Sequence, residues 1–109
     1  DVQKIHDLKA LFTMGSPLAL YCSRWPDFGR PTPMPSDAPW WNVVSAGDPL
    51  AWPIQRLNPE YAKEVREDVI VRPKWWNLKE RTPLAHMSYW TSPTVAETIG
   101  DRVLSVVQQ

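Results

Sequence analysis

The residues of this chain best suited to chemistry are an aspartate and a histidine, Asp48 and His86, each of which follows strand-like sequence. A histidine near neutral pH can take a proton from a hydroxyl nucleophile and later return it to a leaving group. It does so efficiently when a carboxylate holds its ring in one tautomer and stabilises the imidazolium that forms. The pair therefore predicts the acid and the general base of nucleophilic hydrolysis, with Asp48 orienting His86.

Asp48 lies in the turn Gly47-Asp48-Pro49, directly after an aromatic and β-branched stretch at 40–45. The flanking glycine and proline favour a tight turn, which aims the short carboxylate back over the end of the strand. Asp-Pro pairs are also common as plain turn caps, and a single histidine is more often an ordinary surface or core residue. The prediction rests on the joint pattern, since Asp48 and His86 both follow predicted strands.

Three segments have the length and composition of strands, namely 8–14, 40–45 and 68–72. Crossings of a dozen or more residues separate them, as connections between parallel strands require. In a parallel sheet, the side chains that follow the carboxyl ends of the strands converge on one edge, where ligands bind. We therefore predict an α/β fold in which Ser16, Asp48 and the loop carrying His86 share that edge.

Two helices and one irregular segment complete the predicted organisation. A short helix is expected at 59–65, where Asn58 can cap and proline can occupy the first position. A longer helix at 94–108 has apolar residues mostly on one face. The segment 23–39 is rich in proline, and we expect it to be an ordered crossing loop or a cap without regular structure.

Three segments in this order resemble the C-terminal region of α/β-hydrolases of the lipase and esterase kind. The segment 11–18 looks like the strand after the nucleophile helix, with its Gly-Ser-Pro-Leu turn. The segment 41–53 is similar to the following strand and acid turn, and 85–90 is similar to the histidine loop before the last helix. The resemblance covers nearly the whole chain. It implies that residues 1–109 are the C-terminal portion of one such domain, with about three parallel strands, a short crossover helix and a C-terminal helix.

By this resemblance Asp48 would be the triad acid and His86 the general base of a serine hydrolase that cleaves carboxylic esters or lipids. The sequence departs from the family in having no Gly-x-Ser-x-Gly turn, and the family's oxyanion-hole amides have no counterpart here. Ser16 and Ser88 lack the sequence of a nucleophile elbow, so we expect the serine to lie outside this chain. The chain alone should be inactive, and its expected partner is the upstream half of the domain or another chain.

A small ester substrate would need a lined pocket beside Asp48 and His86. We expect Ser16 at the predicted edge and four tryptophans in the surrounding loops to line an acyl or aromatic site, while most tryptophans in a chain of this size serve packing. These four are Trp25, Trp52, Trp75 and Trp76.

Composition excludes several other classes of function. Twelve basic and twelve acidic residues give no net charge, which argues against nucleic acid or an anionic membrane as partner. No apolar run approaches the roughly 18 residues of a membrane span. With two histidines and one cysteine, no zinc site can be assembled, and no cofactor is expected. The single Cys22 cannot form an internal disulfide, which favours a reducing, cytoplasmic location.

The alternative is a non-catalytic interaction module that binds through its seven tryptophans and the proline-rich segment 23–39. The two hypotheses differ in one observable quantity. A hydrolase requires Asp48 and His86 to touch, whereas a binding module is indifferent to the distance between them.

Overall fold

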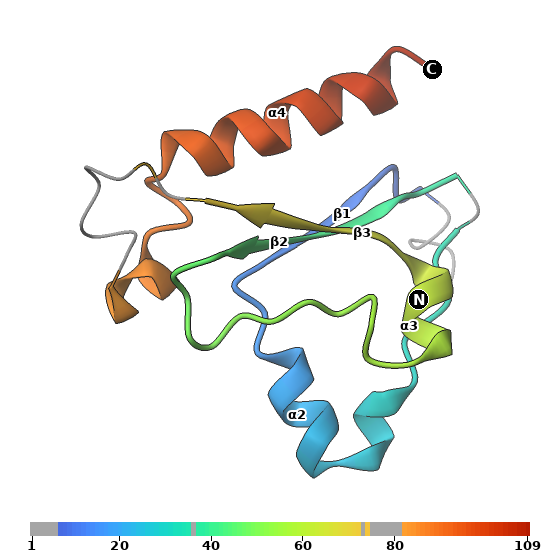
Figure 1. Ribbon diagram of the computed structural model, residues 1–109. Coiled ribbons are helices and arrows are strands. Elements are labelled where there is room, and N and C mark those ends of the chain that lie inside the picture. Colours follow the sequence, from blue (N-terminus) through green and yellow to red (C-terminus); the bar gives the residue numbers. More distant parts are fainter. Residues whose placement is uncertain (1–6, 36, 73, 75–81) are drawn as a thin grey trace.

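A computed structural model describes residues 7–35, 37–72, 74 and 82–109. These residues form a three-stranded parallel sheet with strand order β1-β2-β3 (Figure 1). The strands are β1 (Leu11–Met14), β2 (Trp40–Ser45) and β3 (Val65–Val71). The helices, including the 3-10 helices η1 and η3, are α2 (Leu18–Arg24), η1 (Pro26–Gly29), α3 (Pro59–Glu64), η3 (Pro83–Met87) and α4 (Pro93–Val107). The parallel sheet with helical crossings is compatible with the predicted α/β class.

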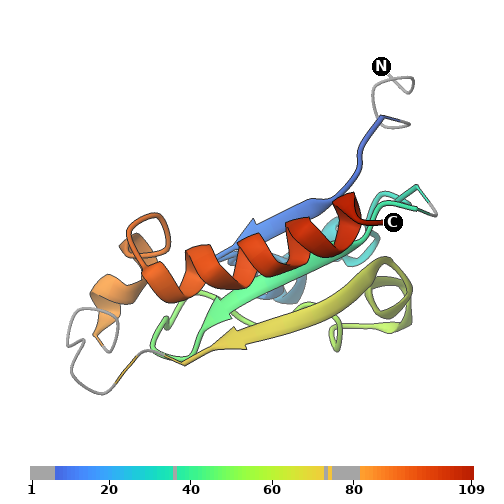
Figure 2. The same cartoon turned by 90° about the horizontal axis from the view of Figure 1, so that it is seen from above.

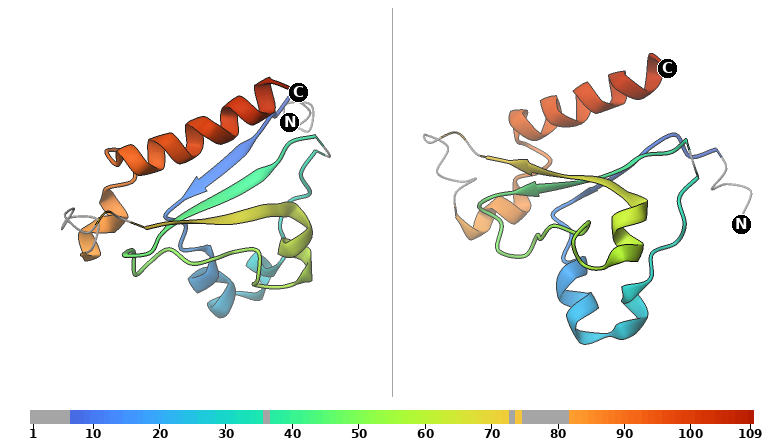
Figure 3. Two further views of the ribbon diagram at one scale, coloured as in Figure 1. Left: turned by 45° about the horizontal axis from the view of Figure 1, so that its top comes forward. Right: turned by 45° about the vertical axis from the view of Figure 1, so that its right-hand side comes forward.

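Helices lie on both faces of the sheet. Helix α4 runs back along one face of the strands, while α2 and η1 lie on the opposite face (Figures 2 and 3). All six residues of β2 are buried, because this central strand has a neighbour on each side and covered faces above and below. The aromatic and β-branched composition of β2 suits such an environment. The acid turn therefore follows the central, fully buried strand of the sheet.

Two capped helices lie close to where they were predicted. The side chain of Asn58 accepts hydrogen bonds from the backbone amides of Glu60 and Tyr61, at 3.0 and 2.9 Å, so it caps α3 as predicted. Ser92 caps α4 through the amide of Val95 at 3.4 Å. The second half of α4 does not pack as its pattern predicted. It diverges from the sheet (Figure 1), and Val103, Leu104 and Val107 are exposed.

The strand boundaries at the edges of the sheet differ from the predicted ones. Strand β1 begins at Leu11 rather than residue 8, because its pairing starts where Leu11 faces Trp40, the first residue of β2. Strand β3 begins at Val65 rather than residue 68, because α3 ends directly at Glu64 and Val65 already pairs with Trp40. Both differences arise because pairing with Trp40, the first residue of β2, determines where each neighbouring strand begins.

The prediction that the proline-rich segment 23–39 lacks regular structure is partly wrong. Helix α2 extends to Arg24, and Pro26 occupies the first position of η1. A first helical turn tolerates proline, because its amide has no partner inside the helix. Three aromatic rings contact one another where α2 leads into η1, with centroids 5.5 to 6.4 Å apart. They belong to Tyr21, Trp25 and Phe28.

A buried asparagine ties the three strands together. Asn42 on β2 is fully buried, and its side-chain oxygen accepts a hydrogen bond from the hydroxyl of Thr13 on β1 at 2.8 Å. Its amide nitrogen donates to the carboxylate of Asp68 on β3 at 2.7 Å and to the carbonyl of Trp52 at 3.2 Å. Asp68 also accepts from the backbone amide of Ile54 at 2.7 Å. This network fixes the segment after the acid turn against the middle of the sheet.

Strand β1 is an edge strand, since it pairs with β2 alone among the described residues. All four of its residues are half-buried, although the sequence has the apolar character of an interior strand. A parallel strand of this kind is usually covered on both sides. Within the described part of the chain, no helix is long and apolar enough to cross a membrane.

Candidate active site

The candidate site lies at the carboxyl edge of the parallel sheet. Strand β2 ends at Ser45 and leads into the turn that carries Asp48, whose amide donates to the carbonyl of Ser45 at 3.0 Å. Helix η3, which carries His86, lies beside that end of the sheet (Figure 1). Pro49 after Asp48 suits this turn, whereas Gly47 does not adopt a positive φ. The sequence prediction that these two residues share one edge is confirmed.

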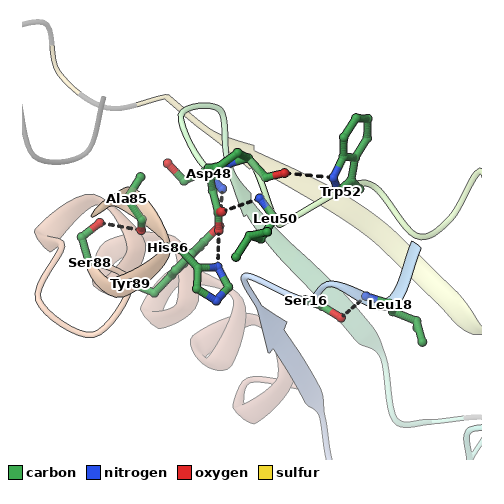
Figure 4. A network of polar contacts seen from close by, with 11 residues as sticks. Ser16, Leu18, Asp48, Leu50, Trp52, Ala85, His86, Ser88 and Tyr89 are labelled. Atoms are coloured by element: carbon green, nitrogen blue, oxygen red, sulfur yellow. Dashed lines mark hydrogen bonds and ion pairs between the residues drawn. The ribbon is translucent and has the colours of Figure 1, made fainter. Parts of the chain in front are cut away.

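Asp48 and His86 form a hydrogen bond. The Nδ1 atom of His86 lies 2.9 Å from Oδ2 of Asp48 (Figure 4), and the Asp48 side chain is fully buried. The other carboxylate oxygen, Oδ1, accepts from the backbone amide of Leu50 at 2.9 Å. Oδ2 also accepts from the hydroxyl of Tyr89 at 2.8 Å. The carboxylate is therefore held by three donors from two different segments of the chain.

The histidine is presented by a short, capped 3-10 helix. The hydroxyl oxygen of Thr82 accepts from the amide of Leu84 at 3.3 Å, and Pro83 occupies the first position of η3. The ring of His86 keeps 36% of its side-chain surface exposed. Because an ionised carboxylate can only accept hydrogen bonds, Nδ1 of His86 must carry a proton. The second ring nitrogen, Nε2, points away from Asp48 (Figure 4) and is the atom available to act as a base.

The protonation states of the carboxyl and the phenol support this assignment. Burial by itself would raise the pKa of Asp48, but the hydrogen bonds from Leu50, His86 and Tyr89 outweigh it, so this pKa lies below its ordinary value of 3.8. Burial, followed by the adjacent carboxylate of Asp48, raises the pKa of Tyr89 above its ordinary value of 10.0. At neutral pH, Asp48 is thus an anion and Tyr89 a neutral donor.

We expect the stabilising effect of the Asp48 carboxylate to disappear in acid. Its folded-state pKa is depressed, so its contribution is present above the unfolded value of 3.8 and is lost as pH falls through the folded value. Urea unfolding between about pH 6 and about pH 2 should show the wild type losing its advantage over Asp48→Asn on acidification. Asp101→Asn, at an exposed position of α4, is the control. A pH-independent difference between wild type and Asp48→Asn would contradict the assignment.

The structure places the predicted substrate-lining residues in different locations. Ser16 follows β1, and its Oγ accepts from the amide of Leu18 at 3.3 Å, which is a local turn interaction (Figure 4). Trp52 is half exposed beside the acid turn, where its ring nitrogen donates to the carbonyl of Pro49 at 3.2 Å. Trp25 belongs to the aromatic cluster with Tyr21 and Phe28. Trp75 and Trp76 lie outside the described residues.

Other polar groups near the pair have local roles. The hydroxyl of Ser88 donates to the carbonyl of Ala85 at 2.9 Å, as expected of a turn residue. Among the described residues, no group of three or more His, Cys, Asp or Glu side chains could hold a metal ion.

A polar hollow of about 540 Å³, lined in part by Lys63 and Arg66, lies at the amino-terminal edge of the strands, away from Asp48 and His86.

Tyr89 was missed by the sequence reasoning, although it lies only three residues after His86. A tyrosine in this position reads as a core aromatic, because nothing local indicates where its hydroxyl will point. Its ring is buried and lies edge-on to the His86 ring, with the centroids 6.5 Å apart. The fold alone brings its hydroxyl to the Asp48 carboxylate.

Comparison with known proteins found no match to this chain, whether among family models, curated proteins or solved structures.

Proposed function

We propose that this chain supplies the acid and the general base of a serine hydrolase that cleaves carboxylic esters or lipids. The observation that carries the proposal is the hydrogen bond between a fully buried Asp48 and a part-exposed His86 at the carboxyl edge of a parallel sheet. A buried carboxylate on Nδ1 and an open Nε2 are what a histidine base requires. A purely structural ion pair has no need of an exposed second nitrogen.

The chemistry assigns each group a separate task. Nε2 of His86 takes the proton of a serine hydroxyl as its oxygen attacks the ester carbonyl carbon, and Asp48 stabilises the imidazolium that results. The imidazolium then gives its proton to the leaving alcohol, and water cleaves the acyl intermediate by the same route. The serine and the oxyanion donors are supplied from outside the described residues.

The arrangement of elements supports the more specific proposal of a C-terminal portion of an α/β-hydrolase domain. The acid turn follows β2, and the histidine precedes the last helix, in the order that this fold uses. Strand β1 leaves one edge unpaired in the described sheet. In the proposed domain, the strand that carries the nucleophile would pair with this edge. The upstream half would thus complete both the sheet and the triad.

A second candidate function is supported by the exposed aromatic cluster of α2 and η1. Four large apolar residues there are each nearly half exposed, and neighbouring exposed residues of this kind form the type of patch that marks interaction sites. They are Leu20, Tyr21, Trp25 and Phe28. A non-catalytic interaction module would use this surface. Its binding would survive the loss of His86 and would fail when the cluster is replaced by polar residues.

The decisive experiment compares the isolated chain with a completed protein. The chain is fused to, or mixed with, an upstream hydrolase segment that contains a Gly-x-Ser-x-Gly turn, and the release of a chromophore from short acyl esters is recorded. We expect background rates from the isolated chain and hydrolysis from the completed protein, because base and orienting acid stabilise little without a nucleophile. A fluorophosphonate probe should label only the supplied serine, and its alanine variant is the control. Strong turnover by the isolated chain, or labelling of Ser16, would overturn the proposal.

A further inference from the structure

Tyr89 occupies the point where three parts of the chain meet. Its hydroxyl donates to Oδ2 of Asp48 at 2.8 Å and accepts from the backbone amide of Ser45 at 2.9 Å. The residue is 5% exposed, so water cannot replace either partner freely. Strand β2, the acid turn and the segment after η3 are thereby joined through one phenol oxygen.

The directions of these hydrogen bonds leave no freedom. A phenol has one proton, and the Ser45 amide can only donate, so the proton of Tyr89 must point at Asp48. Oδ2 of Asp48 then accepts from Tyr89 and from His86 at the same time. This requires Nδ1 of His86 to be the protonated nitrogen.

The end of β1 has a gap that fits the Tyr89 ring. Gly15 has a φ of +60°, and a Cβ atom built there would lie 2.8 Å from Cε2 of Tyr89. Only glycine satisfies both conditions, because other residues adopt this backbone conformation at a cost and would also overlap the ring. The ring is therefore held between Gly15 and the core cluster that includes Val43 and Val95.

From this geometry we propose that Tyr89 is a positioning residue, which holds the Asp48 carboxylate in the orientation that accepts from His86 Nδ1 and thereby sets the tautomer of His86. Its consequence for catalysis rests on the proposed hydrolase function. The tautomer and the hydrogen bond can be measured on this chain alone, without any activity. Tyr89 acts only through Asp48 and His86.

The test is Tyr89→Phe, which keeps the ring and removes the hydroxyl. Nitrogen-15 spectra of the imidazole give the tautomer, and proton exchange with water reports how firmly Nδ1–H is held. In the wild type we expect the Nδ1–H tautomer with slow exchange. In Tyr89→Phe we expect a mixture of tautomers and exchange that is faster by roughly ten- to a hundredfold, the range that corresponds to the loss of one hydrogen bond to a charged group.

Tyr61→Phe is the matched control, because the Tyr61 hydroxyl is also held inside the fold and donates to the carbonyl of Phe28 at 2.6 Å. It should lower stability without changing the His86 signals. Gly15→Ala keeps the Tyr89 hydroxyl but displaces the ring, so it should change those signals as Tyr89→Phe does. All variants are measured in sucrose, which favours the folded state.

Unchanged His86 signals in folded Tyr89→Phe would overturn the positioning role, whether or not a completed protein hydrolyses esters. Altered His86 signals in Tyr89→Phe, together with wild-type signals in Tyr61→Phe, would establish the role even if no hydrolysis were found. If the His86 signals change in Tyr89→Phe but the completed protein does not hydrolyse esters, the proposed hydrolase function is contradicted and the positioning role of Tyr89 stands.

Discussion

His86→Ala in the completed hydrolase is expected to lower the rate of ester hydrolysis by a factor on the order of 10⁶, to the level of the protein without its serine. The serine hydroxyl is a weak nucleophile unless a base accepts its proton, and His86 is the residue whose Nε2 remains open for that task. Asp48→Asn is expected to cost about 10⁴-fold, because an amide that donates toward Nδ1 favours the wrong tautomer. Both losses should fall on kcat, since neither residue is proposed to hold the ground-state substrate.

His6→Ala is the control for these variants, because His6 is the other histidine of the sequence. It should keep the full rate. Steady-state kinetics with a chromogenic short acyl ester give kcat and KM for the wild type and the three variants. Full activity of the completed His86→Ala protein would show that the base has been assigned to the wrong residue. Since triad members act as a unit, a double His86→Ala, Asp48→Asn variant should be no slower than His86→Ala alone.

Asn42→Ala is expected to lower the free energy of unfolding by about 3–5 kcal/mol, the largest effect we expect of any single substitution on stability. The fully buried side chain has hydrogen bonds with Thr13, Trp52 and Asp68. Truncation removes all three interactions and leaves a cavity in the middle of the sheet, although Thr13 still accepts from Trp40 and Asp68 still accepts from Ile54. Since Asp68 also holds the segment after the acid turn, the Asp48 turn should loosen as well.

Asn58→Ala is the control, because it removes an asparagine that is part-exposed rather than buried. It caps α3 at a part-exposed helix end, and its loss should cost about 1–2 kcal/mol. Urea unfolding monitored by tryptophan fluorescence gives both values. Equal destabilisation by the two substitutions would contradict a central role for the Asn42 network, whereas a two- to threefold larger effect of Asn42→Ala would support it.

Local sequence patterns were sufficient to predict several of the strands and helices that position the site. The central strand was predicted with its observed boundaries, because a run of aromatic and β-branched residues ending in glycine, aspartate and proline has few other conformations. The capped helix after Asn58 was predicted because cap and proline act within a single turn. The contact between Asp48 and His86 was predicted because both residues follow strands of one parallel sheet.

Features that depend on packing could not be read in the same way. The end of helix α2 and the whole of η1 lie in the segment 23–39, where proline content suggested a loop, yet Pro26 falls at the first position of η1, which a helix start accepts. The spacing of the apolar residues of α4 predicted a helix with one mostly apolar face, but the helix diverges from a sheet of three described strands and leaves Val107 exposed. How far an apolar face is covered depends on the extent of its partner, which periodicity does not contain.

The same limit applies to the polar contacts of the site. The residue types and their order were enough to name Asp48 and His86, since the chemistry of a histidine base calls for a carboxylate. The sequence around Tyr89 and Gly15 carries no such signal. Their importance arises because the Tyr89 ring packs against Gly15, where a side chain would overlap it. Hydrogen-bond direction is set when distant segments meet, at Ser45, Asp48 and Tyr89, and only the assembled fold brings those segments together.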